Sequence, residues 1–156
     1  MNLPEAKDIF KRKLVIVGVG NILKADDGVG PVVIDRLRGK TRALLIDAGT
    51  APESYTGRII KENPDVVLLI DAVHLDREPG QYEILEKDEI LKSGLTTHDI
   101  SPRMLIEYLA AQTGADIYLL GVQPKAMGLG EDLSPEVAQS IEGIEQFIIE
   151  GEQTHA

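Results

Sequence analysis

Acidic side chains and one histidine follow the apolar runs of this sequence. Asp26 and Asp27 lie in the loop after the first apolar run, and Asp71 stands near the end of a later one. His98 lies in a loop before a predicted helix. Ligands of open α/β sheets bind outside the carboxyl ends of the strands, so these side chains are expected to meet at one edge. Two carboxylates and one imidazole, without sulfur, suit zinc, nickel, manganese or iron(II). The sequence therefore predicts a divalent metal site.

Each of these residues also has a purely structural interpretation. Asp26 and Asp27 precede a predicted helix, where a carboxylate caps free amide groups, and we expect one of the two to do only that. Asp71 could cap a turn. His98 taken alone is more often a hydrogen-bonded loop histidine than a metal ligand. Carboxylates packed together repel one another unless a cation joins them, which favours the metal site.

Other polar residues are weaker candidates. Asp47 is expected to bind neighbouring loop amides, His74 to face solvent, and His155 to lie in the tail. The GVGN segment, residues 18–21, could cradle a phosphate through its backbone amides, but it lacks the third glycine of the dinucleotide-binding pattern. The phosphate interpretation is therefore weak.

The elements that must position these residues alternate between strands and helices. Short β-branched runs predict five strands, and the alternating pattern at 81–85 is typical of an edge strand that could be antiparallel. The remaining runs have no alternation, which indicates parallel strands covered on both faces. We expect a three-layer α/β/α sandwich with a mostly parallel five-stranded sheet. The predicted strands are 13–18, 43–48, 65–73, 81–85 and 116–122; the predicted helices are 28–37, 87–97 in its first part, 101–112 and 134–149, with 54–60 ambiguous.

Composition limits the class of protein. With 156 residues the chain fits one domain, and residues 1–12 and 151–156 are expected to be flexible. The formal charge of −10 disfavours nucleic acid and membrane partners and favours cations. The sequence has no cysteine, which agrees with a reducing compartment, and neither a signal peptide nor an apolar span is seen. We expect a cytoplasmic monomer.

Six blocks of this sequence resemble, in the same order, the hydrogenase maturation endopeptidases. The TTH and GVQP strings favour the subgroup that processes the large subunit of hydrogenase 3. The blocks are GVGNILKADDGVGPVVIDRL (18–37), DAGTAPES (47–54), LLIDAV (68–73), PG (79–80), TTHDISP (96–102) and GVQP (121–124).

The resemblance implies a function and a site. Members of that family remove a C-terminal extension from the large subunit of nickel–iron hydrogenase after nickel has been inserted, and the nickel is what they recognise. Their metal-contacting positions, also the expected catalytic ones, fall here on Asp27, Asp71 and His98, and Asp47 matches a supporting acidic position. The resemblance thus implies nickel carried by the substrate, zinc or cadmium as surrogates, an aspartic-type endopeptidase classification, and an enzyme-activating role.

Two chemical routes and two rival functions stay open. The metal could activate water as a Lewis acid, or it could only orient the scissile bond while Asp27 or Asp71 acts as general base. One rival is a receiver-like phosphoacceptor domain, with the acidic pair, Asp71 as acceptor and Lys125 in place of the usual lysine. The other is a nucleotide-binding module that uses GVGN. A serine or threonine nucleophile ranks below these alternatives.

Overall fold

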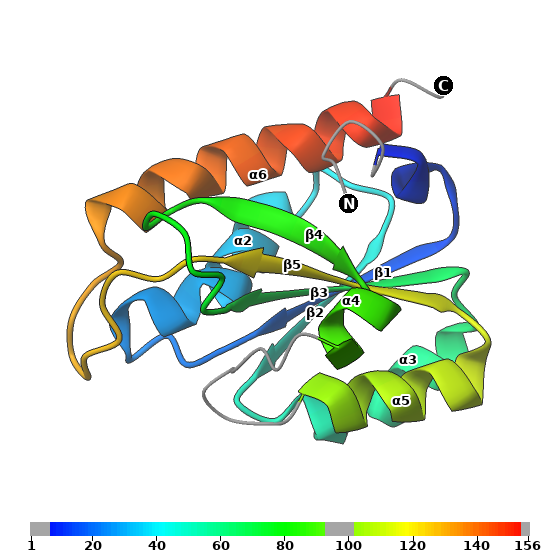
Figure 1. Ribbon diagram of the computed structural model, residues 1–156. Coiled ribbons are helices and arrows are strands. Elements are labelled where there is room, and N and C mark those ends of the chain that lie inside the picture. Colours follow the sequence, from blue (N-terminus) through cyan, green and yellow to red (C-terminus); the bar gives the residue numbers. More distant parts are fainter. Residues whose placement is uncertain (1–6, 93–101, 154–156) are drawn as a thin grey trace.

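The computed structural model describes residues 7–92 and 102–153 and contains one five-stranded sheet (Figure 1). The strand order is β2-β1-β3-β5-β4. The pairs β1–β2, β1–β3 and β3–β5 are parallel, and β4 runs antiparallel to β5 at one edge. The predicted mostly parallel sheet with an antiparallel edge strand is confirmed. The bounds are β1 Leu14–Val19, β2 Leu44–Gly49, β3 Val66–Ala72, β4 Tyr82–Glu86 and β5 Asp116–Val122.

The central strand β3 shows why the sheet is covered on both faces. All seven of its residues are buried. Because successive side chains of a strand point to opposite faces, Leu68 and Ile70 join one apolar cluster while Val67 and Leu69 join the other. An uninterrupted apolar run therefore serves two cores, as the sequence predicted.

Helices form the two outer layers (Figure 1). The helices α2 and α6 pack on one face, with the short 3-10 helix η1, and α3, α4 and α5 pack on the other. The three-layer sandwich is thus confirmed. The bounds are η1 Lys7–Lys11, η2 Ala25–Gly28, α2 Val29–Leu37, η3 Pro52–Tyr55, α3 Thr56–Glu62, α4 Lys87–Lys92, α5 Pro102–Thr113 and α6 Pro135–Gln153.

The described parts of the lead-in and of the tail pack against each other. Phe10 in η1 is buried and meets Phe147 of α6 edge to face, with ring centroids 5.4 Å apart at 85°. A Cβ at Gly151 would collide with the Phe10 ring, so α6 packs closely against η1. Burial of the Phe10 side chain offsets the conformational entropy that is lost when both segments become ordered. The helix α6 continues past its predicted end at residue 149 to Gln153.

The helix predicted at 28–37 begins with a separate 3-10 turn, η2, and the ambiguous segment 54–60 is helical as part of η3 and α3. Of the helix predicted within 87–97, α4 covers Lys87–Lys92, and the rest of that segment lies outside the described residues. Within 7–92 and 102–153, no helix combines the length and apolar character needed to cross a bilayer.

Candidate functional site

Asp27 and Asp71 lie at the carboxyl ends of adjacent parallel strands. Asp27 belongs to η2, which follows β1, and Asp71 is the next-to-last residue of β3. Their exposed fractions are only 2% and 8%. Gly20 lies against both: a Cβ there would overlap the carbonyl oxygen of Asp27 and would lie 3.7 Å from Asp71 Oδ1. The structure therefore brings these two acidic residues, far apart in the sequence, around one glycine.

The GVGN loop shapes this arrangement. Gly20 has a φ of +140°, which residues with a side chain rarely adopt, and its N–H donates to the Gly49 carbonyl oxygen at 2.8 Å. The N–H of Asn21 donates to Asp27 Oδ2 at 2.9 Å, and Asn21 Oδ1 accepts from the N–H of Leu23 at 2.9 Å. Since these loop amides already have protein acceptors, the loop orders Asp27 and is a poor phosphate cradle. This weakens the nucleotide-binding alternative.

Asp71 has a short-range contact of its own. Its Oδ1 accepts a hydrogen bond from the N–H of Ala72 at 2.8 Å. This contact holds the carboxylate at the strand end, where β3 leaves the sheet. Asp71 therefore stays at the edge of the sheet where Asp27 also lies.

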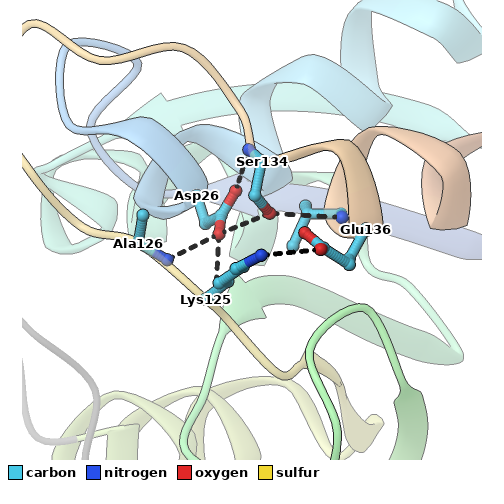
Figure 2. A network of polar contacts seen from close by, with 6 residues as sticks. Asp26, Lys125, Ala126, Ser134 and Glu136 are labelled. Atoms are coloured by element: carbon cyan, nitrogen blue, oxygen red, sulfur yellow. Dashed lines mark hydrogen bonds and ion pairs between the residues drawn. The ribbon is translucent and has the colours of Figure 1, made fainter.

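Asp26 has a different role from its neighbour (Figure 2). The Asp26 side chain is fully buried. Its Oδ2 accepts from the N–H groups of Lys125 and Ala126 at 2.8 and 2.9 Å and from Ser134 Oγ at 2.9 Å, and its Oδ1 accepts from the Ser134 N–H at 2.7 Å. Ser134 Oγ in turn accepts from the N–H of Val137, in the first turn of α6. Asp26 thus joins η2 to a segment about a hundred residues away.

We predicted that one residue of the acidic pair has only a structural role, as a cap of the helix that follows. Asp26 has a structural role, but it does not cap that helix. The residues at the N-caps of η2 and α2, Lys24 and Gly28, make no side-chain capping bond. Asp26 takes the structural role, but its acceptor oxygens face residues 125–134, because that segment folds back over η2 and presents several amide groups at once. Asp27, the other member, is the one beside Asp71.

Lys125 is ion-paired next to this network. Its Nζ lies 2.8 Å from Glu136 Oε1 (Figure 2). The hydrogen bond to Glu136 raises the pKa of Lys125, and the same bond lowers the pKa of Glu136. The receiver-like alternative needs a lysine directed at the acceptor aspartate, whereas this ammonium faces Glu136. That alternative is weakened accordingly.

Gln123 is a structural residue that the sequence did not reveal. Its buried side chain accepts at Oε1 from the N–H of Leu75 at 2.7 Å and donates from Nε2 to the Pro124 carbonyl oxygen at 3.2 Å. It thereby ties the end of β5 to the chain that leaves β3 just past Asp71. The available signal was a single amide side chain placed directly after a buried strand, where most positions are apolar.

The other predicted residues are placed as follows. Asp47 is exposed and accepts from the N–H of Gly49 at 3.2 Å, as expected of a loop-binding residue. His74 is exposed, as predicted. His98 and His155 lie outside the described residues. In the part of the chain that the structure describes, no three histidine, aspartate or glutamate side chains form a group suited to a metal. That part holds Asp27 and Asp71, two members of the predicted metal-binding set.

The chain is similar to known proteins in sequence and in fold. The family model for hydrogenase maturation proteases of the HycI type matches residues 33–151. The crystal structure of a NiFe hydrogenase maturation protease, HycI, from Thermococcus kodakarensis superimposes with a TM-score of 0.87 at 33% identity, covering 96% of this chain and 99% of that one. The solution structure of the endopeptidase HycI from Escherichia coli gives 0.77 at 29% identity, with 86% and 87% covered. The curated hydrogenase 3 maturation protease of Escherichia coli is 29% identical over 135 residues, 85% of this chain and 86% of that protein.

Proposed function

This chain belongs to the hydrogenase maturation protease family, and we propose that it removes the C-terminal extension from the large-subunit precursor of a nickel–iron hydrogenase once nickel has been inserted. The observation that carries this proposal is the meeting of Asp27 and Asp71 around Gly20 at the carboxyl edge of the sheet. The nickel is part of the substrate. Within the family, we propose an activity of the hydrogenase 3 type, because a relative that matches most of this chain is named hydrogenase 3 maturation protease.

In this proposal Asp27, Asp71 and His98 complete the coordination of the nickel that the substrate carries. Oxygen and imidazole nitrogen are donors that a divalent nickel ion accepts. Only a loaded precursor then has the anchor that places its scissile bond, so cleavage becomes conditional on metal insertion. Zinc or cadmium are the proposed surrogates when the protein is studied without its substrate.

The hydrolytic step has two candidate routes on these residues. A bound divalent ion lowers the pKa of water and polarises a carbonyl group. Alternatively, the carboxylate of Asp27 or Asp71 removes the proton from water as general base, which corresponds to the aspartic-type classification. Both routes benefit from carboxylates that are shielded from bulk water, and the burial of Asp27 and Asp71 supports this.

The partner and compartment are proposed from the surface. Ile22, Leu23 and Leu129 are large apolar side chains with exposed fractions of 65%, 63% and 73%. The Gly130 N–H donates to the Leu23 carbonyl oxygen at 2.7 Å, so the chain at 129–130 lies next to the chain at 22–23, which precedes η2. Exposed apolar side chains next to a site support a protein substrate over a small molecule. We propose a monomer that acts in the cytoplasm, with no nucleic acid or membrane partner.

The proposed function predicts that cleavage depends on nickel in the precursor. The purified protein should shorten a nickel-loaded large-subunit precursor and leave the nickel-free precursor intact, because the latter lacks the anchor. Gel mobility and the mass of the released peptide measure the reaction. Equal cleavage of both precursors would refute recognition through nickel, and no cleavage of either would refute the protease assignment for that partner.

The proposed ligands predict weaker metal binding in two variants. Asp27→Asn and Asp71→Asn should each reduce the affinity for cadmium or zinc by about tenfold or more, since a neutral amide is a poorer donor than a carboxylate. Isothermal calorimetry measures the affinity. Asp35→Asn, on the exposed face of α2, removes the same charge elsewhere and should leave the affinity near that of the parent protein. Unchanged affinity in both site variants would place the metal elsewhere.

A further inference from the structure

The element that carries Asp27 lacks the means to hold its own shape. η2 is a four-residue 3-10 turn, too short to be stable alone. It starts at Ala25, whose φ of +47° is unfavourable for a residue with a Cβ. Its N-cap residue, Lys24, provides no side-chain bond. The position of Asp27 must therefore be imposed from outside η2.

Besides the Asn21 N–H, which donates to Asp27 Oδ2, the segment 125–134 contacts η2. Backbone hydrogen bonds join this segment to the chain on either side of Ala25, and the Asp26 carboxylate adds four more acceptor contacts (Figure 2). The backbone bonds run from Gly130 N to Leu23 O at 2.7 Å, from Ala25 N to Glu131 O at 3.1 Å and from Asp26 N to Ala126 O at 2.9 Å. The bonds to the Asp26 carboxylate are charge-assisted and therefore stronger than these backbone bonds. Asp26 is the residue directly before Asp27.

We propose that Asp26 is a positioning residue for the reaction: by binding residues 125–134 it fixes η2 and so holds Asp27 in place against Asp71. The proposal rests on the proposed function, because it assigns Asp26 to the same site. Both oxygens of Asp26 accept hydrogen bonds from Lys125, Ala126 and Ser134. It therefore acts through geometry and does not touch the substrate.

This role differs from a general contribution to stability. The core that fixes α2 and α6 is built from buried apolar side chains such as Val33, Ile34, Ile141 and Ile144. Loss of the Asp26 contacts is therefore expected to release η2 and its partner segment locally while the sheet and helices stay folded. A local release moves Asp27, whereas a global loss of stability only lowers the folded fraction.

The test uses Asp26→Asn in the full chain. Asparagine offers one acceptor oxygen and turns an N–H₂ group toward amide donors, so at least one contact is lost. Under conditions in which circular dichroism shows the variant folded, we expect kcat for the nickel-loaded precursor to fall by about tenfold or more, with KM changed less than about twofold. The amide of Asn21, which donates to Asp27 Oδ2, should exchange its hydrogen about tenfold faster, while core amides of β3 stay protected.

Two further variants complete the design. Arg38→Ala removes an exposed ion pair, with Asp35 at the end of α2, and none of the Asp26 contacts described above, so its kcat and Asn21 exchange should match the parent protein. Ser134→Ala removes the hydroxyl bond to Asp26 without changing charge, and should shift both quantities in the direction of Asp26→Asn by about threefold. It replaces Asp26→Asn if that variant does not fold.

The outcomes are distinct. A joint fall in kcat and rise in Asn21 exchange supports the proposal, and a change in only one of the two, or in neither, overturns it. If the parent protein cleaves no precursor, the proposed function fails, and Asn21 exchange alone then decides whether Asp26 holds η2.

Discussion

Replacement of His98 by alanine is expected to abolish cleavage of the nickel-loaded precursor and to leave the fold intact. Asp27 and Asp71 supply oxygen donors at the carboxyl edge of the sheet, and the imidazole is the proposed third donor to the substrate's nickel. The two apolar clusters that support the sheet are built from apolar side chains of the described residues, which this variant leaves unchanged. Gel mobility of the precursor measures the activity, and thermal unfolding followed by circular dichroism measures the fold.

His74→Ala is the matched control for this experiment. His74 is an exposed histidine that follows β3, and the same side-chain truncation there should leave cleavage unchanged. Cleavage at the normal rate by His98→Ala would remove His98 from the mechanism. Equal loss of activity in both variants would mean that the effect is not specific to residue 98.

Replacement of Gly30 by alanine is expected to cause the largest loss of stability, about 3 kcal/mol in the free energy of unfolding. Gly30 lies in α2 where that helix crosses β1 and β3. A Cβ at this position would overlap the carbonyl oxygens of Val19 and Ile70, which are backbone atoms and cannot rotate away. α2 would have to move off the sheet, and η2 would move with it. Urea unfolding measures the change as a lower midpoint.

Gly57→Ala provides the opposite case. Gly57 lies in α3, and a Cβ there would meet nothing within 4 Å. Alanine favours the helix over glycine by up to about 1 kcal/mol, so this variant should be neutral or slightly more stable. A Gly30→Ala protein as stable as the Gly57→Ala protein would show that the contact between α2 and the sheet adapts more easily than the geometry indicates.

The fold could be predicted from the sequence to a large extent because its signals are local. The uninterrupted apolar run of β3 indicated a strand covered on both faces, and the alternation at 81–85 indicated the antiparallel edge strand. The packing of Phe10 was not predicted, because its partner is distant in the sequence. Phe10 has its packing partner, Phe147, near the other end of the chain, and no pattern around Phe10 reveals that contact.

The site could be predicted in part. The rule that ligands gather beyond the carboxyl ends of parallel strands pointed to the pair Asp26–Asp27 and to Asp71, and the family resemblance singled out Asp27. The structure brings Asp27 and Asp71 to Gly20. The placement of His98 stays a prediction. The spacing of Asp26 and Asp27 did not show which of the two has the structural role, because adjacent carboxylates before a helix are equivalent in the sequence pattern.

The sequence by itself determined the succession of strands and helices along the chain, the buried character of the central strand and the family. It also indicated the acidic residues that a cation site requires. Only the tertiary structure decided what Asp26 does and what holds Asp27. The reason is that the donors to Asp26 come from residues 99 to 108 positions away. Hydrogen bonds at that separation depend on how the 125–134 segment folds back over η2, and the local pattern of polar residues does not predict that folding.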